Sequence, residues 1–173
     1  VYTDSTLGHE GGDWRIEGIS LRSTDIADAL NPQDGLYTLI VRREEGVSAR
    51  VIGSIRRVIA AAREREAALA ALAVPETRIA SMTVTEKAYG IDRARGAVDT
   101  AHPAIAADLA NPRAPVGVIG MLVEGLRLRR EKSLTPYTVL CCDNLPDNGS
   151  LVRAGVLDFA RRIDPALAGW IES

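Results

Sequence analysis

The run Tyr137-Thr138-Val139-Leu140-Cys141-Cys142 leads directly into Asp143-Asn144-Leu145-Pro146-Asp147-Asn148-Gly149, and this junction decides the fold. Its apolar half has the pattern of a short strand that is buried on both faces of a parallel sheet. Its polar half has the Asp, Asn, Pro and Gly residues of a loop between a strand and a helix. A helix should follow, because one stripe of it would gather the apolar residues Leu151, Val152, Val156, Phe159 and Ile163.

Outward from this junction, strands and helices alternate along the chain. Periodicity and composition predict strands over 14–21, 36–42, 49–55 and 78–84, and helices over 26–30, 56–73, 103–109 and 116–130. The second and third of these strands are joined by a short polar turn and should form an antiparallel pair. Residues 90–99 are predicted to be a polar loop. Such alternation implies right-handed crossovers and a mainly parallel sheet, so the predicted fold class is α/β.

The composition is that of an ordinary globular domain, with 173 residues, 46% hydrophobic and 25% charged residues, and a net charge of -2. That balance excludes nucleic acid as the main partner, and the basic runs 42–43 and 127–130 are predicted to be solvated surfaces. No apolar run reaches the ~18 to 20 residues of a membrane span. Cys141 and Cys142 are neighbours without a nearby histidine, which predicts neither a disulfide framework nor a metal site and favours a reducing, cytoplasmic compartment.

Polar residues gather at three predicted strand ends, in segments 22–25, 85–90 and 143–149. Ligands of open α/β sheets bind beyond the carboxyl ends of strands, so these segments are the candidate sites. Asp25 could accept hydrogen bonds from the adenosine ribose hydroxyls of a dinucleotide, whereas Arg22 could meet a 2′-phosphate. The alternative, which local sequence alone favours, is that Asp25 and its neighbours cap the following helix.

Glu86 and Asn144 follow the other two strand ends, and each has two interpretations. Glu86, beside Thr85, could relay a proton near a nicotinamide, or it could cap the next turn and pair with Lys87. Asn144 could donate its amide to a substrate oxygen, or it could belong to an ordinary loop in which Asn148 caps the last helix. The chain contains no GxGxxG, HExxH or CxxC motif, so the residues alone predict only an α/β domain with ligand-competent strand ends.

Several blocks of the chain, in order and at consistent separation, resemble the mannitol dehydrogenase family, the long-chain polyol-specific dehydrogenases and reductases. One is Ser81-Met82-Thr83-Val84-Thr85-Glu86-Lys87-Ala88-Tyr89, which looks like the family's central signature with Ala88 where glycine is common. The most specific is 142–149, and the early blocks are 14–22, 36–39 and 51–55. The resemblance extends over nearly the whole chain.

The resemblance implies a Rossmann-type NAD(P)-binding domain with a mainly parallel sheet, in a zinc-independent enzyme. It implies hydride transfer between a polyol and a ketose, such as mannitol and fructose, or reduction of a hexuronate such as fructuronate or tagaturonate. By position, Asp25 matches the acid that favours NAD over NADP, with Thr24 where some members have a second acid, so NADP stays possible. Asn144 matches an asparagine that polarises the reacting carbonyl. Glu86 matches a carboxylate near the nicotinamide, where Thr85 is also expected to contact the cofactor.

The resemblance also implies parts that these residues do not include. The family's glycine-rich turn should precede Val1, and its general-base lysine, with a companion asparagine and histidine, should lie beyond Ser173. We therefore expect residues 1–173 to form one incomplete dinucleotide-binding domain without its first strand, followed by a helical catalytic domain. We expect this chain alone to bind NAD weakly and to turn nothing over. A non-catalytic dinucleotide-binding module is the alternative from another functional class.

Overall fold

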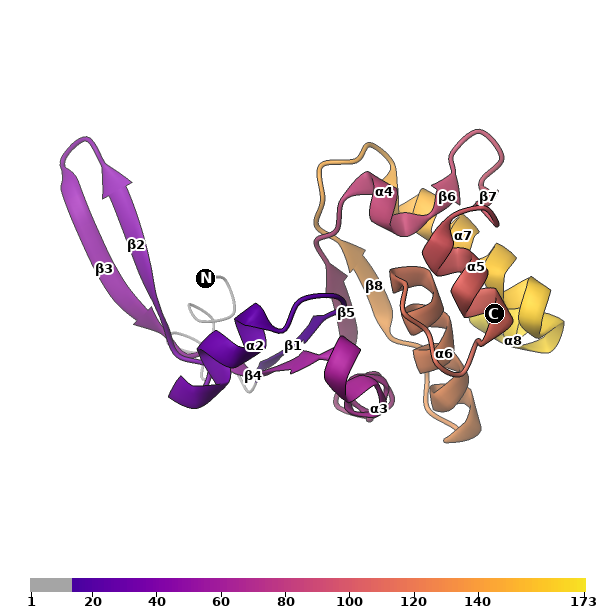
Figure 1. Cartoon of the computed structure of the whole chain (residues 1–173), viewed down its shortest axis with the longest axis horizontal. Helices are drawn as coiled ribbons and strands as arrows, with labels where there is room; N and C mark the ends of the chain where they lie inside the picture. The colour runs from indigo at the N-terminus through magenta and orange to yellow at the C-terminus, as the bar shows by residue number, and fades with distance from the viewer. Residues whose placement is uncertain (1–13) are drawn as a thin grey trace. The chain divides into compact units, whose positions relative to one another are not determined.

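The computed structural model describes residues 14–173, which fall into two compact units. Unit 1 ends at Ala68, and unit 2 is Leu69–Ser173. Figure 1 labels the helices and strands of both units.

Unit 1 is built on two parallel strands, β1 (Ile16–Ser20) and β4 (Ile55–Ala60). Helix α2 (Asp25–Leu30) and the 3-10 turn η1 (Asn31–Gln33) follow β1, and a small apolar cluster lies between α2 and β4. The side chain of Asn31 continues the β4 ladder, because its amide nitrogen donates to the Val58 carbonyl and its oxygen accepts from the Val58 amide, both at 2.8 Å.

Strand β4 corrects the sequence prediction, which placed a helix from residue 56 onward. The helix, α3 (Ala61–Leu72), begins only after the strand. Val58 and Ile59 are β-branched and buried, and they lie opposite Gly18 and Ile19 of β1. Burial and pairing of these side chains outweigh the helical propensity of the Ala- and Arg-rich sequence around them.

The predicted antiparallel pair is confirmed as β2 (Tyr37–Arg43) and β3 (Gly46–Ile52), although β3 begins and ends earlier than expected. Within unit 1 this hairpin extends away from α2 and β4 (Figure 1). One of its faces carries Ile40, Val47 and Val51, all of them exposed.

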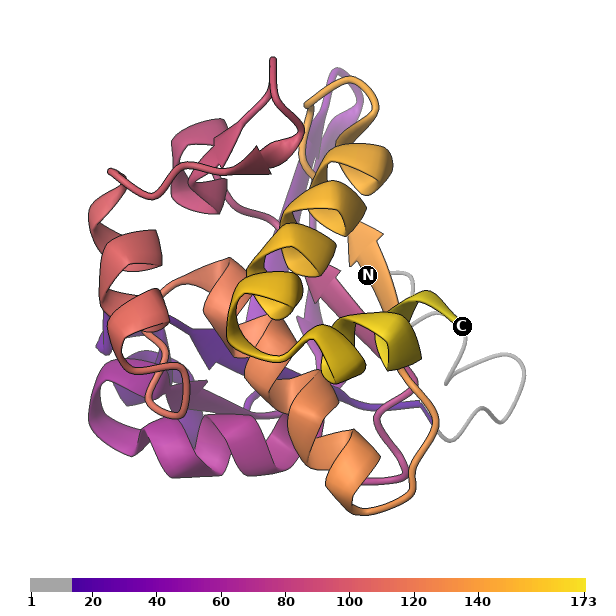
Figure 2. The same ribbon diagram turned by 90° about the vertical axis from the view of Figure 1, so that its right-hand side faces the viewer.

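Unit 2 also contains a parallel pair, β5 (Ile79–Met82) and β8 (Thr138–Cys141), in register with Met82 opposite Cys141. The predicted helices at 103–109 and 116–130 are confirmed as α5 (Pro103–Ala110) and α6 (Val118–Glu131). Two more helices, α7 (Asn148–Ile163) and α8 (Pro165–Glu172), pack against α6. Figure 2 shows α6 in orange, α7 in gold and α8 in yellow.

Several elements of unit 2 differ from the sequence prediction. Residues 90–99 are not an unstructured loop, because β6 (Ile91–Asp92) and β7 (Ala97–Val98) form a small hairpin that follows the short helix α4 (Glu86–Tyr89). The last predicted helix starts earlier, at Asn148, and α8 was not predicted.

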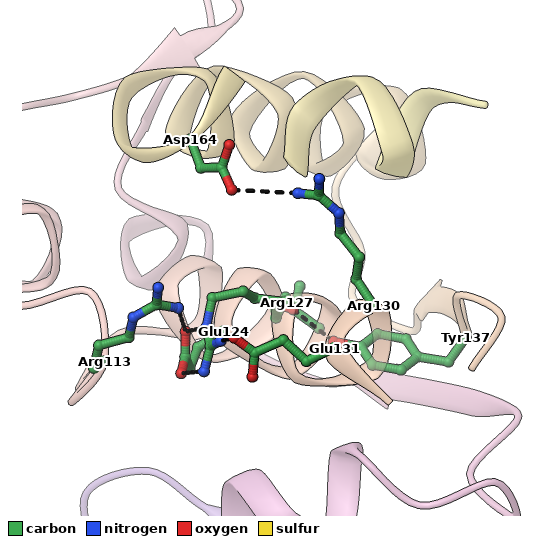
Figure 3. Close-up of polar contacts among 8 residues, drawn as sticks. Arg113, Glu124, Arg127, Arg130, Glu131, Tyr137 and Asp164 are labelled. Atoms are coloured by element: carbon green, nitrogen blue, oxygen red, sulfur yellow. Dashed lines mark hydrogen bonds and ion pairs between the residues drawn. The ribbon is translucent and has the colours of Figure 1, made fainter. Parts of the chain in front are cut away.

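The basic run 127–130 is not a solvated surface. The Arg129 side chain is buried and donates to the Leu72, Val74 and Thr135 carbonyls, which ties α6 to the segments that precede β5 and β8. Arg127 donates twice to the buried Glu124 carboxylate, at 2.7 Å each (Figure 3). These groups satisfy one another, which is how a helix can bury charges.

Candidate active site and cofactor site

The carboxyl ends of β5 and β8 lie at the same edge of unit 2, because the two strands are parallel. The amide of Cys142, the first residue after β8, donates at 2.8 Å to the carbonyl of Met82, the last residue of β5. Thr85 and Glu86 follow β5, and Asn144 follows β8. The structure therefore brings together the two loops that carry these three candidate residues.

A buried tyrosine joins the two loops. Tyr89, at the end of α4, is 1% exposed, and its hydroxyl donates to the Asp143 carboxylate. The other oxygen of that carboxylate accepts from the Asn148 side-chain amide at 2.9 Å and from the Leu145 backbone amide at 3.0 Å.

The hydrogen bond between Tyr89 and Asp143 joins a protonated group to an ionised one. Burial, reinforced by Asp143, raises the pKa of Tyr89 above its usual range. The Tyr89 hydroxyl and then the Asn148 amide hold the pKa of the Asp143 carboxyl below its ordinary value. Near neutral pH, Tyr89 is thus a protonated donor and Asp143 an ionised acceptor.

Asn144 lies at the centre of this turn and is exposed. Among residues 14–173, its side chain has no hydrogen-bond partner, which leaves both the amide donor and the carbonyl acceptor available to a ligand. The predicted cap Asn148 is instead the first residue of α7. The N-cap is Asp147, which has a φ of 55°, and the Asn148 amide is directed back to Asp143.

Glu86 and Thr85 lie at the beginning of α4. The Glu86 carboxylate pairs with Arg93 at 3.1 Å, so Lys87 is not the partner that local spacing suggests. Thr85 is the N-cap residue, but its side chain makes no capping hydrogen bond. Glu86 is exposed and its partner is also exposed, so the carboxylate remains accessible.

Asp25 and Arg22 belong to unit 1, beyond the end of β1. Asp25 is the first residue of α2, whose N-cap is Thr24, and no side chain forms the cap hydrogen bond. The Ser23 hydroxyl accepts from the Asp25 amide at 3.0 Å instead. Both Asp25 and Arg22 are exposed and, within the described part of the chain, neither side chain has a partner.

The chain is similar to known proteins over nearly its whole length. The family model described as the mannitol dehydrogenase Rossmann domain matches residues 2–173. The chain belongs to the mannitol dehydrogenase family. The predicted α/β fold of Rossmann type is thereby confirmed.

Two relatives and one solved structure show how closely the chain follows other members of the mannitol dehydrogenase family. It is 41% identical to mannitol 2-dehydrogenase of Cereibacter sphaeroides, covering 100% of this chain and 37% of that protein. It is 40% identical to D-mannonate oxidoreductase of Escherichia coli (strain K12), covering 99% and 36%. The Pseudomonas fluorescens mannitol 2-dehydrogenase ternary complex with NAD and D-mannitol superimposes with a TM-score of 0.89 at 38% identity, covering 99% and 36%. The chain thus spans little more than a third of these relatives.

Sequence reasoning missed Tyr89 and the role of Asp143. Both lie inside segments that resemble the family, but 54 positions separate them and nothing in the spacing predicts their contact. Within residues 14–173, no group of three or more His, Cys, Asp or Glu side chains is placed to hold a metal ion, and no helix is long and apolar enough to cross a membrane.

Proposed function

We propose that the protein containing this chain is an NAD-dependent oxidoreductase that interconverts a polyol and a ketose by hydride transfer. The observation that carries the proposal is the edge of unit 2, where the loop after β8 is bonded to α4. On this loop lies Asn144, which is exposed and whose side chain has no hydrogen-bond partner among residues 14–173. The bound NAD and D-mannitol of the 38% identical structure support the same class of cofactor and substrate.

Each candidate residue has a role in this proposal. Bound NAD would supply the acceptor or donor of the hydride. Asn144 donates its amide hydrogen to the substrate oxygen while negative charge develops there, an interaction that favours the transition state over the ground state. Glu86 and Thr85 contact the nicotinamide end of the cofactor.

Asp25 would select the cofactor. Asp25 is exposed and has no side-chain partner in the described part of the chain, so its carboxylate fits the ribose hydroxyls, which can donate to it, and repels a 2′-phosphate. Arg22, three residues earlier and also exposed, is the residue that would accommodate NADP if Asp25 were absent. The geometry of α2 supports NAD because Asp25 makes no side-chain cap that would occupy it.

We further propose that residues 1–173 belong to one dinucleotide-binding domain, that a helical domain supplies the general base, and that the protein works in the cytoplasm. Free Cys141 and Cys142 suit a reducing compartment, and burial raises the pKa of Cys141, which keeps that thiol protonated and unreactive.

The second candidate is reduction of a hexuronate, which the 40% identity to D-mannonate oxidoreductase favours. Steady-state NADH oxidation by the full-length enzyme with fructose, fructuronate and tagaturonate decides between the two. We expect the highest kcat/KM with the ketose. A higher value with either sugar acid would assign the enzyme to the second candidate, and NADH binding without turnover of any polyol, ketose or sugar acid would indicate a non-catalytic module.

A further inference from the structure

Three hydrogen-bond donors from three parts of unit 2 converge on the Asp143 carboxylate. The Tyr89 hydroxyl comes from α4, the Leu145 amide from the loop itself, and the Asn148 side chain from α7. The Asn148 amide nitrogen also lies 3.3 Å from the Asp143 carbonyl oxygen. One carboxylate thus connects the loop after β8 to the helix after β5 and to the helix that follows the loop.

The position of Asn144 depends directly on this carboxylate. The bond from the Leu145 amide to Asp143 at 3.0 Å closes a turn around Asn144, because it joins the residues immediately before and after it. Asn144 itself makes no side-chain contact that would hold it in place among the described residues. Its orientation is therefore set through the backbone, by what holds Asp143.

Tyr89 is in turn held rigidly. It is buried, and the next residue, Gly90, has a φ of 62° and packs so closely that an added Cβ would lie 2.6 Å from Ile105 Cγ1 and 2.8 Å from His102 Nδ1. Because this phenol ring is fixed and bonded to Asp143, the position of α4, which also carries Glu86, determines the position of the loop after β8.

We propose that Tyr89, through Asp143, is a positioning residue that holds Asn144 in the geometry needed for hydride transfer. The inference rests on the proposed function, since it requires Asn144 to act on the substrate oxygen. Neither Tyr89 nor Asp143 touches the substrate in this account. Displacement of a catalytic group by about 1 Å can cost roughly 100-fold in rate, so loss of one of three donors should reduce turnover measurably.

The opposite protonation states of the two groups agree with a positional role. Tyr89 stays protonated and Asp143 stays ionised near neutral pH, so the pair keeps one arrangement of donor and acceptor and passes no proton. Removal of the hydroxyl should therefore lower kcat by the same factor at each pH, without moving the pH profile.

The test is Tyr89→Phe in the full-length enzyme, which removes only the hydroxyl. We expect kcat and kcat/KM for the polyol to fall together by about 10- to 100-fold, with the KM for NAD unchanged. Tyr137→Phe is the matched control. It removes another buried hydroxyl of unit 2, which donates to the Leu122 carbonyl at 2.7 Å within α6, and should leave kcat unchanged even if it lowers the melting temperature.

A double-mutant cycle with Asn144→Ala separates positioning from a general loss of structure. If Tyr89 acts through Asn144, adding Tyr89→Phe to Asn144→Ala should reduce kcat by less than about twofold. A full, multiplicative loss in that background would overturn the inference, as would an unaffected kcat in Tyr89→Phe alone. If Tyr89→Phe does not fold, the same double-mutant cycle is carried out with Asn148→Ala, which removes another donor to the Asp143 carboxylate from a half-buried side chain.

The two proposals fail in different ways. An Asn144→Ala enzyme with unchanged turnover would remove the basis of both. A large loss in Asn144→Ala combined with no loss in Tyr89→Phe and Asn148→Ala would overturn the positioning role alone.

Discussion

Asp25 and Asp28 are both acids in the first turn of α2, but their side chains are engaged differently. Hydrogen bonds from the Thr24 side chain and then from Arg63, at 3.0 Å, lower the pKa of the Asp28 carboxyl. Asp25 makes no such contact within the described residues. An acid near a helix N-terminus is favourable wherever it lies in the turn, so helix stability alone does not require both.

This difference predicts the effect of exchanging Asp25 in the complete enzyme. Asp25→Ser should raise the kcat/KM ratio of NADP to NAD, because it removes a carboxylate facing the 2′-phosphate and frees Arg22 to meet it. Loss of a charge-assisted hydrogen bond to the ribose should cost NAD about 1.5 to 3 kcal/mol. Asp28→Ser, three residues along the same helix, is the control and should leave the ratio unchanged. Equal behaviour of the two variants would show that Asp25 only stabilises α2.

Gly90 tests how tightly α4 is anchored. Its positive φ costs an alanine about 1 to 2 kcal/mol, and the close approach of Ile105 adds roughly 1 to 3 kcal/mol of overpacking. Gly90→Ala should therefore lower the free energy of unfolding by at least about 2 kcal/mol in denaturant titrations. Gly169→Ala in α8, where nothing lies within 4 Å of the new Cβ, should be neutral or stabilising. A neutral Gly90→Ala would contradict the packing described around α4.

At the level of elements, β4 depends on a side chain that lies outside any strand. Asn31 satisfies both polar groups of Val58 on the edge of β4 that faces away from β1. Asn31→Ala should lower the free energy of unfolding by about 1 to 3 kcal/mol, because a buried residue then has an unpaired amide and carbonyl. Asn111→Ala, which removes an exposed amide at the end of α5, is the control. Equal stability of the two variants would mean that water replaces Asn31 at no cost.

The elements also show what sequence could and could not predict. Apolar runs and stripes predicted β1, β5, β8 and α7, because burial of one face imposes a local period on the sequence. The helical propensity of its residues predicted α3, although from residue 56 onward. The strand at 55–60 was missed because its Arg and Ala neighbours favour a helix and only pairing with β1 reverses that preference. The contact of Tyr89 with Asp143 was missed because it depends on two loops meeting beyond parallel strands, which no local pattern encodes.

Over the described chain as a whole, buried residues are distributed unevenly among the elements. Every residue of α6 from Val118 to Leu126 is buried, whereas β2 and β3 are a two-stranded ribbon with Ile40, Val47 and Val51 exposed. Two-stranded hairpins are marginally stable by themselves. In hydrogen exchange, α6 amides should therefore exchange the slowest and those of β2 and β3 the fastest among the regular elements. Protection of the hairpin equal to that of α6 would show that its apolar face is covered in solution.

At the scale of the whole enzyme, Asn144 either acts on the substrate or only shapes a loop, and one variant distinguishes these two roles directly. In full-length Asn144→Ala enzyme, kcat and melting temperature are determined on the same preparation, together with the affinity for NADH. We expect turnover to fall by roughly 100- to 1000-fold, the equivalent of ~2.7 to 4 kcal/mol, as for the loss of one oxyanion donor, with the melting temperature and NADH affinity nearly unchanged. A lower melting temperature with full turnover per folded molecule would contradict the account and make Asn144 a structural residue of the loop.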